Sequence, residues 1–163
     1  MTILASLTVA LGTGVGTASA AVTPMQGGVG CIDQTTISNV ASAGQVTRSP
    51  SGPYWQVSGV GPATLTLSHA NSVANTYSVT AGVNVAKISS AVGYNVTETR
   101  TVTTSYAYGI PAGQNWMVRA DTVFNKKTFS WKRVHGCTMS MVTDTGTGYS
   151  LQFARLAYRA YQI

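Results

Sequence analysis

The chain has 163 residues, of which 44% are hydrophobic and only 9% are charged, and its formal net charge is +6. This apolar content is enough for a packed core, which excludes an intrinsically disordered chain. Because charged residues are few, hydroxyl and amide side chains must supply much of the polar surface, and the abundant Thr, Val and Tyr favour strands. The positive charge favours contact with anionic surfaces, with simple solubility as the alternative, and no lysine-rich or base-stacking motif indicates nucleic acid.

The first twenty residues have the pattern of a secretory signal peptide. Residues 3–15 are apolar or small without a charged side chain, and Ala18, Ser19 and Ala20 provide small residues before a cleavage site. We expect cleavage before Ala21, which leaves residues 21–163 as a single secreted β domain. The alternative is that residues 1–20 form a buried terminal strand or helix.

Two cysteines, Cys31 and Cys137, are the only ones in the chain. In an exported protein they meet an oxidising environment, so we expect one disulfide between them. Two buried free thiols or a shared metal ion are the alternatives, although the spacing fits no zinc pattern.

Residues 21–61 are rich in Gly, Ser, Thr and Pro, and they predict short strands joined by turns, with a loop at 48–53. Residues 63–85 then alternate, with a largely apolar face at the odd positions, interrupted by a polar break at 69–75, and a small, mostly hydroxylated face at the even positions. Residues 92–108 repeat this alternation with a polar break at Glu98 and Arg100. Period two over such lengths predicts strands, and the short link at 86–91 predicts one long antiparallel hairpin over 63–108.

Further turns and strands are expected after the hairpin. Turn signals occur at 110–114, 125–127 and 146–148, and alternating strands are expected at 116–124 and 128–132. The closing segment 149–163 suits a strand or a helix, and we favour a strand. The predicted fold class is all-β, an elongated antiparallel sheet or sandwich with one long Ser/Thr-rich amphipathic hairpin.

The order of these elements resembles a known family. A long Ser/Thr strand, a short link, a second Ser/Thr strand and a Pro-x-Gly corner follow one another, and residues 99–114, TRTVTTSYAYGIPAGQ, carry the second strand and the corner. Residues 63–132 are in this respect similar to the central module of aerolysin-like β-pore-forming toxins, in the epsilon-toxin and mosquitocidal-toxin branch.

The resemblance implies a mechanism in which a hairpin folded against the monomer is released after oligomerisation and inserts into a target membrane. The partners would be a membrane or cell-surface receptor and further copies of the chain, and no cofactor would be needed. Residues implied to enter the membrane are the larger side chains around the hairpin end: Val79, Val83, Val85, Ile88, Val92, Tyr94 and Val96. The alternative function is a non-lytic secreted β-sandwich that binds a cell surface, a wall polymer or a glycan.

Basic and aromatic residues further along the chain form a candidate contact surface for an anionic membrane. They are Lys126, Lys127, Trp131, Lys132 and Arg133, and the alternative for Lys126 and Lys127 is a solvated hairpin tip. An aromatic platform for sugars or lipid headgroups, with packing inside the sheet as its alternative, would draw on Tyr54, Trp55, Tyr106, Tyr108, Trp116 and Trp131.

No pattern in the chain indicates catalysis or a metal site. The sequence holds only four acidic residues and two histidines, and it contains neither a nucleophile-elbow motif nor a His-Glu-x-x-His helix. We therefore expect a non-enzymatic protein that acts by binding and assembling.

Overall fold

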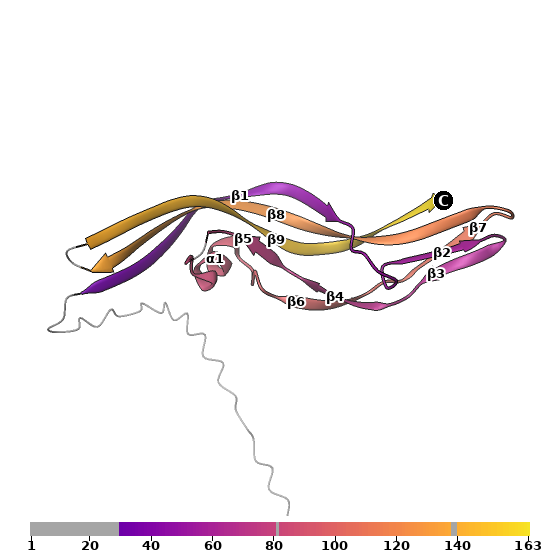
Figure 1. The fold of residues 1–163 in the computed structure, drawn as a ribbon, viewed down its shortest axis with the longest axis horizontal. Coiled ribbons are helices and arrows are strands. Elements are labelled where there is room, and N and C mark those ends of the chain that lie inside the picture. Colours follow the sequence, from indigo (N-terminus) through magenta and orange to yellow (C-terminus); the bar gives the residue numbers. More distant parts are fainter. Residues whose placement is uncertain (1–29, 81, 138–139) are drawn as a thin grey trace, which may run out of the picture. The chain divides into compact units, whose positions relative to one another are not determined.

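Two 23-residue strands, β8 (Asn115–Cys137) and β9 (Ser140–Gln162), form the antiparallel ladder on which the other elements are arranged (Figure 1). The computed structural model describes residues 30–80, 82–137 and 140–163. The expected signal peptide at residues 1–20 lies outside these residues. At about 3.3 Å per residue, each of the two strands spans roughly 75 Å.

The remaining strands of the same sheet pair on either side of this ladder. β1 (Cys31–Arg48) and β2 (Gln56–Val60) both pair antiparallel with β8, and β5 (Thr76–Ser78) pairs with β9. The sheet order is β1-β8-β9-β5, with β2 on β8 beyond the end of β1. Most of the described residues lie in antiparallel strands, and their one helix is short. The all-β class expected from the sequence is therefore confirmed.

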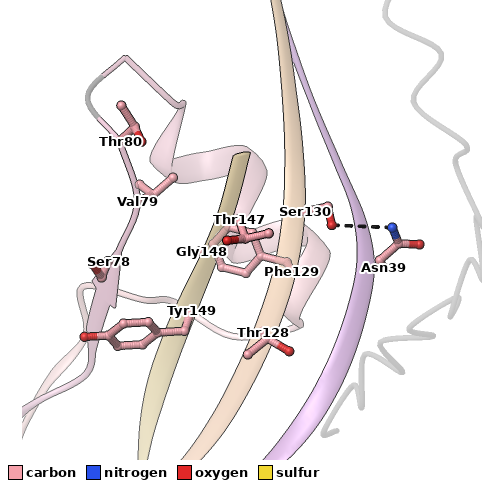
Figure 2. Close-up of a pocket in the computed structure, with 10 residues that line it drawn as sticks. All are labelled: Asn39, Ser78, Val79, Thr80, Thr128, Phe129, Ser130, Thr147, Gly148 and Tyr149. Carbon is pink, nitrogen blue, oxygen red and sulfur yellow. Dashed lines mark hydrogen bonds between the residues drawn. The ribbon is translucent and has the colours of Figure 1, made fainter. Parts of the chain in front are cut away.

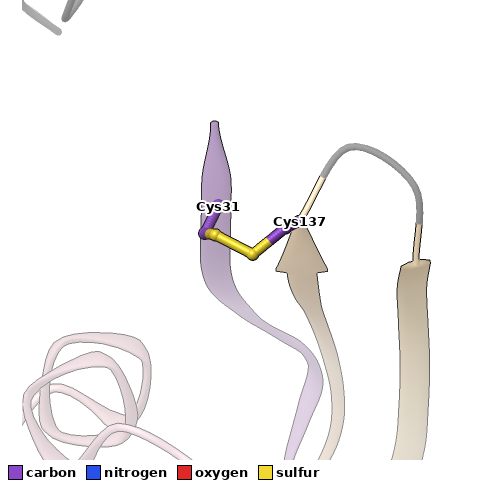
Figure 3. The surroundings of a disulfide bond; sticks show 2 residues. All are labelled: Cys31 and Cys137. Atoms are coloured by element: carbon purple, nitrogen blue, oxygen red, sulfur yellow. A yellow bond between two sulfur atoms is a disulfide. The ribbon is translucent and has the colours of Figure 1, made fainter. Parts of the chain in front are cut away.

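A disulfide joins Cys31 and Cys137, as the sequence predicted (Figure 3). The two residues are register partners at the paired ends of β1 and β8, which places their side chains on the same face of the sheet. The bridge therefore ties the first residue of the sheet to the end of its central strand.

The two Ser/Thr-rich runs pair with each other in two short two-stranded sheets. β3 (Ala63–Leu67) pairs with β7 (Tyr106–Ile110), and β4 (Ala70–Ala74) pairs with β6 (Thr99–Thr103). In every pair of both ladders the two residue numbers add up to 173, so a single register runs through both sheets. The expected hairpin is thus present at the end away from its turn, over residues 63–74 and 99–110.

The part of the expected hairpin near its turn, residues 76–97, is not a pair of strands in the structure. This corrects the prediction of a turn at 86–91. Val85–Val92 form the helix α1. Its N-cap is Asn84, whose side chain accepts hydrogen bonds from two backbone amides, and its C-cap is Gly93 in the left-handed conformation at φ 82°. Val85, Ile88 and Val92 also fit helical spacing, so this segment satisfies both periods and its caps decide in favour of the helix.

The turns expected at 125–127 and 146–148 are also wrong, because both segments lie inside the long strands. Gly146 is the register partner of Trp131, and Gly148 is the partner of Phe129. A Cβ at Gly146 would lie 2.8 Å from Trp131 Cζ2, and one at Gly148 would lie 2.7 Å from Phe129 Cε2. These glycines give aromatic rings room to lie across β9, and they do not end a strand. The closing segment is a strand, as we favoured.

Buried apolar side chains form three clusters along the sheet. One contains Phe129 and Trp131 with residues from 83–96, a second contains Leu67 and Val118 between β3/β7 and β8, and a third contains Val73, Phe124 and Leu151. Helices long and apolar enough to cross a membrane are not found among the described residues.

Replacing both Cys31 and Cys137 with serine should lower the free energy of unfolding by about 4–5 kcal/mol in the chain-entropy account, because the bridge closes a long loop. The sequence separation of the two residues is 106. Urea unfolding of the variant and the oxidised parent, followed by circular dichroism, measures the difference. A loss below about 1 kcal/mol would show that the bridge contributes little to folding.

Candidate functional site

The hairpin ladder ends at Asn75 and Glu98, and the chain between them, residues 76–97, turns away from it. Asn75 N donates to Glu98 O at 2.8 Å, which is the last rung of the 173 register. The Asn75 side chain, 5% exposed, donates to Asn95 O at 2.9 Å and accepts from Phe153 N at 2.8 Å. Asn75 therefore fixes both ends of the 76–97 segment to β9.

One apolar face of the 76–97 segment is buried against β8 and against Ile37 of β1. Val83, Ile88, Val92 and Val96 are each at most 8% exposed and share a cluster with the aromatic rings of β8. Burial of one such side chain contributes about 1.5–3 kcal/mol, so the four together contribute roughly 6–12 kcal/mol. The other residues predicted to enter a membrane pack half-buried against the same cluster: Val79, Val85 and Tyr94. The structure thus brings all seven predicted residues together.

Lys127 on β8 holds the C-terminal end of helix α1. Its Nζ donates to Val92 O at 2.7 Å, and it lies 5.8 Å from the centre of the Tyr94 ring. A cation at this end of a helix meets the partial negative charge of the unpaired carbonyl groups. Tyr94 in turn donates its hydroxyl to Ser150 Oγ on β9 at 2.7 Å. Polar bonds therefore hold the segment to both long strands.

Arg133 lies against the other end of the helix-containing segment, at Gly82. Its guanidinium bonds both carboxylate oxygens of Asp33 on β1, at 2.8 and 2.6 Å. The hydrogen bond from Arg133 lowers the pKa of Asp33, and the same bond raises the pKa of Arg133. Gly82 has φ 90°, a left-handed conformation that favours glycine, and a Cβ there would displace the Arg133 guanidinium.

A cavity of about 670 Å³ borders the start of the segment (Figure 2). Ser78, Val79 and Thr80 lie on one side of it, and Thr147 and Tyr149 of β9 lie on another. This free space means that residues 78–80 are packed less tightly than the buried face that follows them.

The five residues proposed as one basic and aromatic surface are divided between two faces of β8. Lys127, Trp131 and Arg133 share the face that contacts 76–97, whereas Lys126 and Lys132 point to the opposite face, as strand alternation requires. Trp131 is only 5% exposed, which corrects its assignment as a surface residue. Lys126 lies over the ring of Tyr149 at 5.0 Å.

Each of the four acidic residues lies beside a basic partner. Glu98 pairs with Arg100 at 2.7 Å, and the hydrogen bond from Arg100 lowers the pKa of Glu98. Asp144 contacts His135 at 2.9 Å, and Asp121 contacts Arg159. In the part of the chain that the structure describes, no group of three or more His, Cys, Asp or Glu residues is placed to hold a metal ion.

Sequence reasoning did not identify Phe129, Ser150 or Asn75, which hold the segment in place. Gly148, the register partner of Phe129, could have indicated a large buried ring at Phe129, but we interpreted it as a turn residue. No local pattern marks Ser150 or Asn75, because their partners lie 56 and 78 residues away.

Comparison of the chain with protein-family models, with curated proteins and with solved structures found no match. Its function must therefore be inferred from the contacts and the register described above.

Replacing Lys127 with methionine should release the C-terminal half of the segment from the sheet more often. The variant keeps the apolar stem and loses a hydrogen bond from a charged group, worth about 1.5–3 kcal/mol, so local opening should rise at least tenfold. Hydrogen exchange of the amides in 88–97 measures the opening. Lys126→Met, on the opposite face of β8, is the control. Equal protection in both variants would contradict a holding role for Lys127.

Proposed function

We propose that the protein is a secreted pore-forming or membrane-perturbing protein that acts by oligomerisation and by insertion of residues 76–97 as a β-hairpin. The observation that carries this proposal is the register of β3/β7 and β4/β6, in which paired residue numbers add up to 173. When the 76–97 segment leaves the sheet, the same ladder can continue through it without a shift.

Continuing the register pairs Thr76 with Thr97 and Val85 with Ile88, and it leaves Ala86 and Lys87 as a two-residue turn. Two-residue connections are the commonest in β-hairpins. The strands 76–85 and 88–97 then match the ~9–11 residues that a membrane-spanning strand needs. The new hairpin would extend the existing one, and every residue pair already formed in β3/β7 and β4/β6 would keep its partner.

The extended register separates the side chains of 76–97 into two chemically different faces. Lys87, at the turn, is the only charged residue in the segment. One face, apolar except for Ser90, suits lipid: Tyr77, Val79, Ala81, Val83, Val85, Ile88, Ser90, Val92, Tyr94 and Val96. The other face, small or polar throughout, suits water: Thr76, Ser78, Thr80, Gly82, Asn84, Ser89, Ala91, Gly93, Asn95 and Thr97.

The conversion of α1 into strand is energetically accessible. The helix has eight residues, shorter than the roughly 12–15 at which isolated helices become marginally stable in water, so its stability comes from packing. Val85, Ile88 and Val92 are β-branched and favour strands once that packing is lost. In the hairpin their apolar side chains face lipid instead of the sheet.

Oligomerisation follows from the hydrogen bonds of the inserted strands. A single hairpin in a bilayer would leave its outer backbone groups unpaired, each at a cost of several kcal/mol. Neighbouring copies can satisfy these groups by pairing hairpin to hairpin. The resemblance in element order that the sequence suggests between residues 63–132 and the aerolysin-like module would imply the same sequence of events, and the disulfide and the predicted signal peptide support secretion.

Two adjacent substitutions on α1 test the proposed register. Ser90 and Ala91 are both exposed in the folded monomer, so aspartate at either position should leave folding intact. Ser90 would face lipid and Ala91 water after insertion. Ser90→Asp should therefore reduce dye release from liposomes containing anionic lipid several-fold, because a carboxylate on the lipid face opposes insertion, whereas Ala91→Asp should retain release.

Circular dichroism of both variants before mixing controls for folding. Equal loss of dye release in the two variants, or loss in Ala91→Asp alone, would contradict the register. Binding of the unmodified protein to the vesicles without release or an SDS-resistant oligomer would favour the non-lytic, surface-binding alternative.

A second pair of positions tests the same alternation near the middle of the hairpin. Val79→Cys and Thr80→Cys, each labelled with the environment-sensitive dye NBD, border the cavity of Figure 2, which leaves room for the label. On addition of liposomes the Val79 label should shift to shorter wavelength and brighten, because it enters lipid, and the Thr80 label should not. Identical responses at both positions would exclude an inserted strand with this register.

A further inference from the structure

We propose that the cavity beside Trp55 binds a pyranose ring that carries a carboxylate, such as an acidic sugar at the end of a glycan. This site lies at the loop between β1 and β2, away from Phe129 and Trp131, and of residues 76–97 it includes only Thr76. The proposal goes beyond membrane insertion, and it holds whether or not the hairpin inserts.

The loop that forms one wall of the cavity is anchored by a buried acid. Asp121 on β8 is 0% exposed and accepts a hydrogen bond from Ser49 Oγ at 2.7 Å. Arg119 donates to the carbonyl oxygens of Ser49 and Pro50 at 3.1 and 3.0 Å, and it lies 3.6 Å from the Asp121 carboxylate. Arg159 on β9 contacts the other carboxylate oxygen of Asp121 at 2.6 Å. A buried charge held by two arginines gives this loop a defined position.

Backbone bonds at Trp55 complete the arrangement. Trp55 N donates to Gly52 O at 3.1 Å and closes a turn, and Ala120 N donates to Trp55 O at 2.8 Å. The indole is half-buried between two of the apolar clusters and lines the cavity. Its position is therefore set before any ligand binds, which lowers the entropic cost of binding.

The cavity measures about 470 Å³, within the ~300–1,000 Å³ of small-ligand sites. Its lining is mostly apolar and it opens to solvent; Phe124 lines it but is only 4% exposed, so the half-buried ring of Trp55 is the one available for stacking. Aromatic rings offer flat apolar faces on which the C–H face of a sugar ring can stack. A broad, open cavity suits a ring, whereas an acyl chain requires an enclosed channel.

Arg48 provides the charge that selects an acidic sugar. Its guanidinium is exposed at the cavity and lies 5.7 Å from the centre of the Phe124 ring. None of the ion pairs among residues 30–80, 82–137 and 140–163 involves Arg48. A guanidinium in this position can bond both oxygens of a carboxylate attached to a ring stacked beside it.

Hydroxyl groups at the cavity can bond the remaining groups of a sugar. Ser72 is exposed on β4 at the edge of the cavity. Thr76 also lines it, and its Oγ1 is buried without a hydrogen-bond partner among the described residues. An unpaired buried oxygen marks a position where a water molecule or a ligand hydroxyl is needed.

The experiment titrates the mature, oxidised protein with free monosaccharides and follows its three tryptophan indole N–H signals by NMR. The probes are the methyl glycosides of N-acetylneuraminic acid and glucuronic acid, with methyl glucoside as the neutral comparison. We expect a saturable shift of the Trp55 signal with at least one acidic probe and at least tenfold weaker binding of the neutral one. Absence of a saturable shift with both acidic probes, or equal binding of the neutral sugar, overturns the proposal.

Two variants assign the binding to this cavity. Arg48→Gln, at an exposed position that should not affect folding, should weaken binding of the acidic probe at least tenfold, since it removes a charge-assisted hydrogen bond. Trp55→Phe should weaken it less, because a smaller ring remains. Arg155→Gln and Trp116→Phe are the matched controls on other parts of the sheet and should bind as the parent does. Equal weakening by Arg155→Gln, or binding of octanoate as strong as that of the acidic sugar, overturns the proposal.

These titrations contain no lipid and do not depend on oligomerisation. Failure of the sugar to bind therefore leaves the hairpin proposal unaffected, and failure of dye release leaves the sugar site unaffected.

Discussion

The arrangement of this protein depends on a single apolar face, that of residues 76–97, which must be removed from water. In the structure Phe129 and Trp131 of β8 and Ile37 of β1 cover it, and Gly146 and Gly148 of β9 leave room for the two aromatic rings. The same face would be covered by lipid if the segment became a hairpin. Both states would satisfy the hydrophobic requirement, so the smaller polar contacts at the edges of the segment would decide between them.

The sequence predicted those parts of the fold in which local pattern and tertiary pairing agree. The period-two runs located the strands of the outer hairpin, and export together with two cysteines indicated the disulfide. The prediction of a hairpin turn at 86–91 was wrong, because this segment fits both strand alternation and helical spacing. The caps Asn84 and Gly93 favour the helix α1. Prediction also failed at Gly146 and Gly148, because a glycine opposite an aromatic residue on a neighbouring strand is indistinguishable from a turn residue in the sequence alone.

The sequence predicted one part of the candidate site, the apolar residues of 76–97, and misgrouped another, the basic and aromatic residues of β8. All seven residues named from the sequence gather in one cluster, because Val85, Ile88 and Val92 fit helical spacing as well as alternation and therefore share a face on α1 too. The basic and aromatic residues of β8 were grouped by proximity in the chain, and strand alternation then separated Lys126 from Lys127. Contacts such as Tyr94 with Ser150 join residues distant in sequence, and no single-strand pattern contains them.

The contacts that hold the rest of the sheet lie outside residues 76–97, so the proposed departure of this segment would not require the sheet to unfold. The disulfide and the 23-residue ladder of β8 and β9 lie outside 76–97, and so do the pairs of β3/β7 and β4/β6. Among the described residues of the segment, 76–80 and 82–97, regular pairing to the sheet involves the three residues of β5. Its retention thus rests on side-chain burial of roughly 6–12 kcal/mol and a few polar bonds, and a bilayer can replace the burial. With a frame that is covalently closed and a segment held mainly by side chains, the proposed release of 76–97 would be a local event.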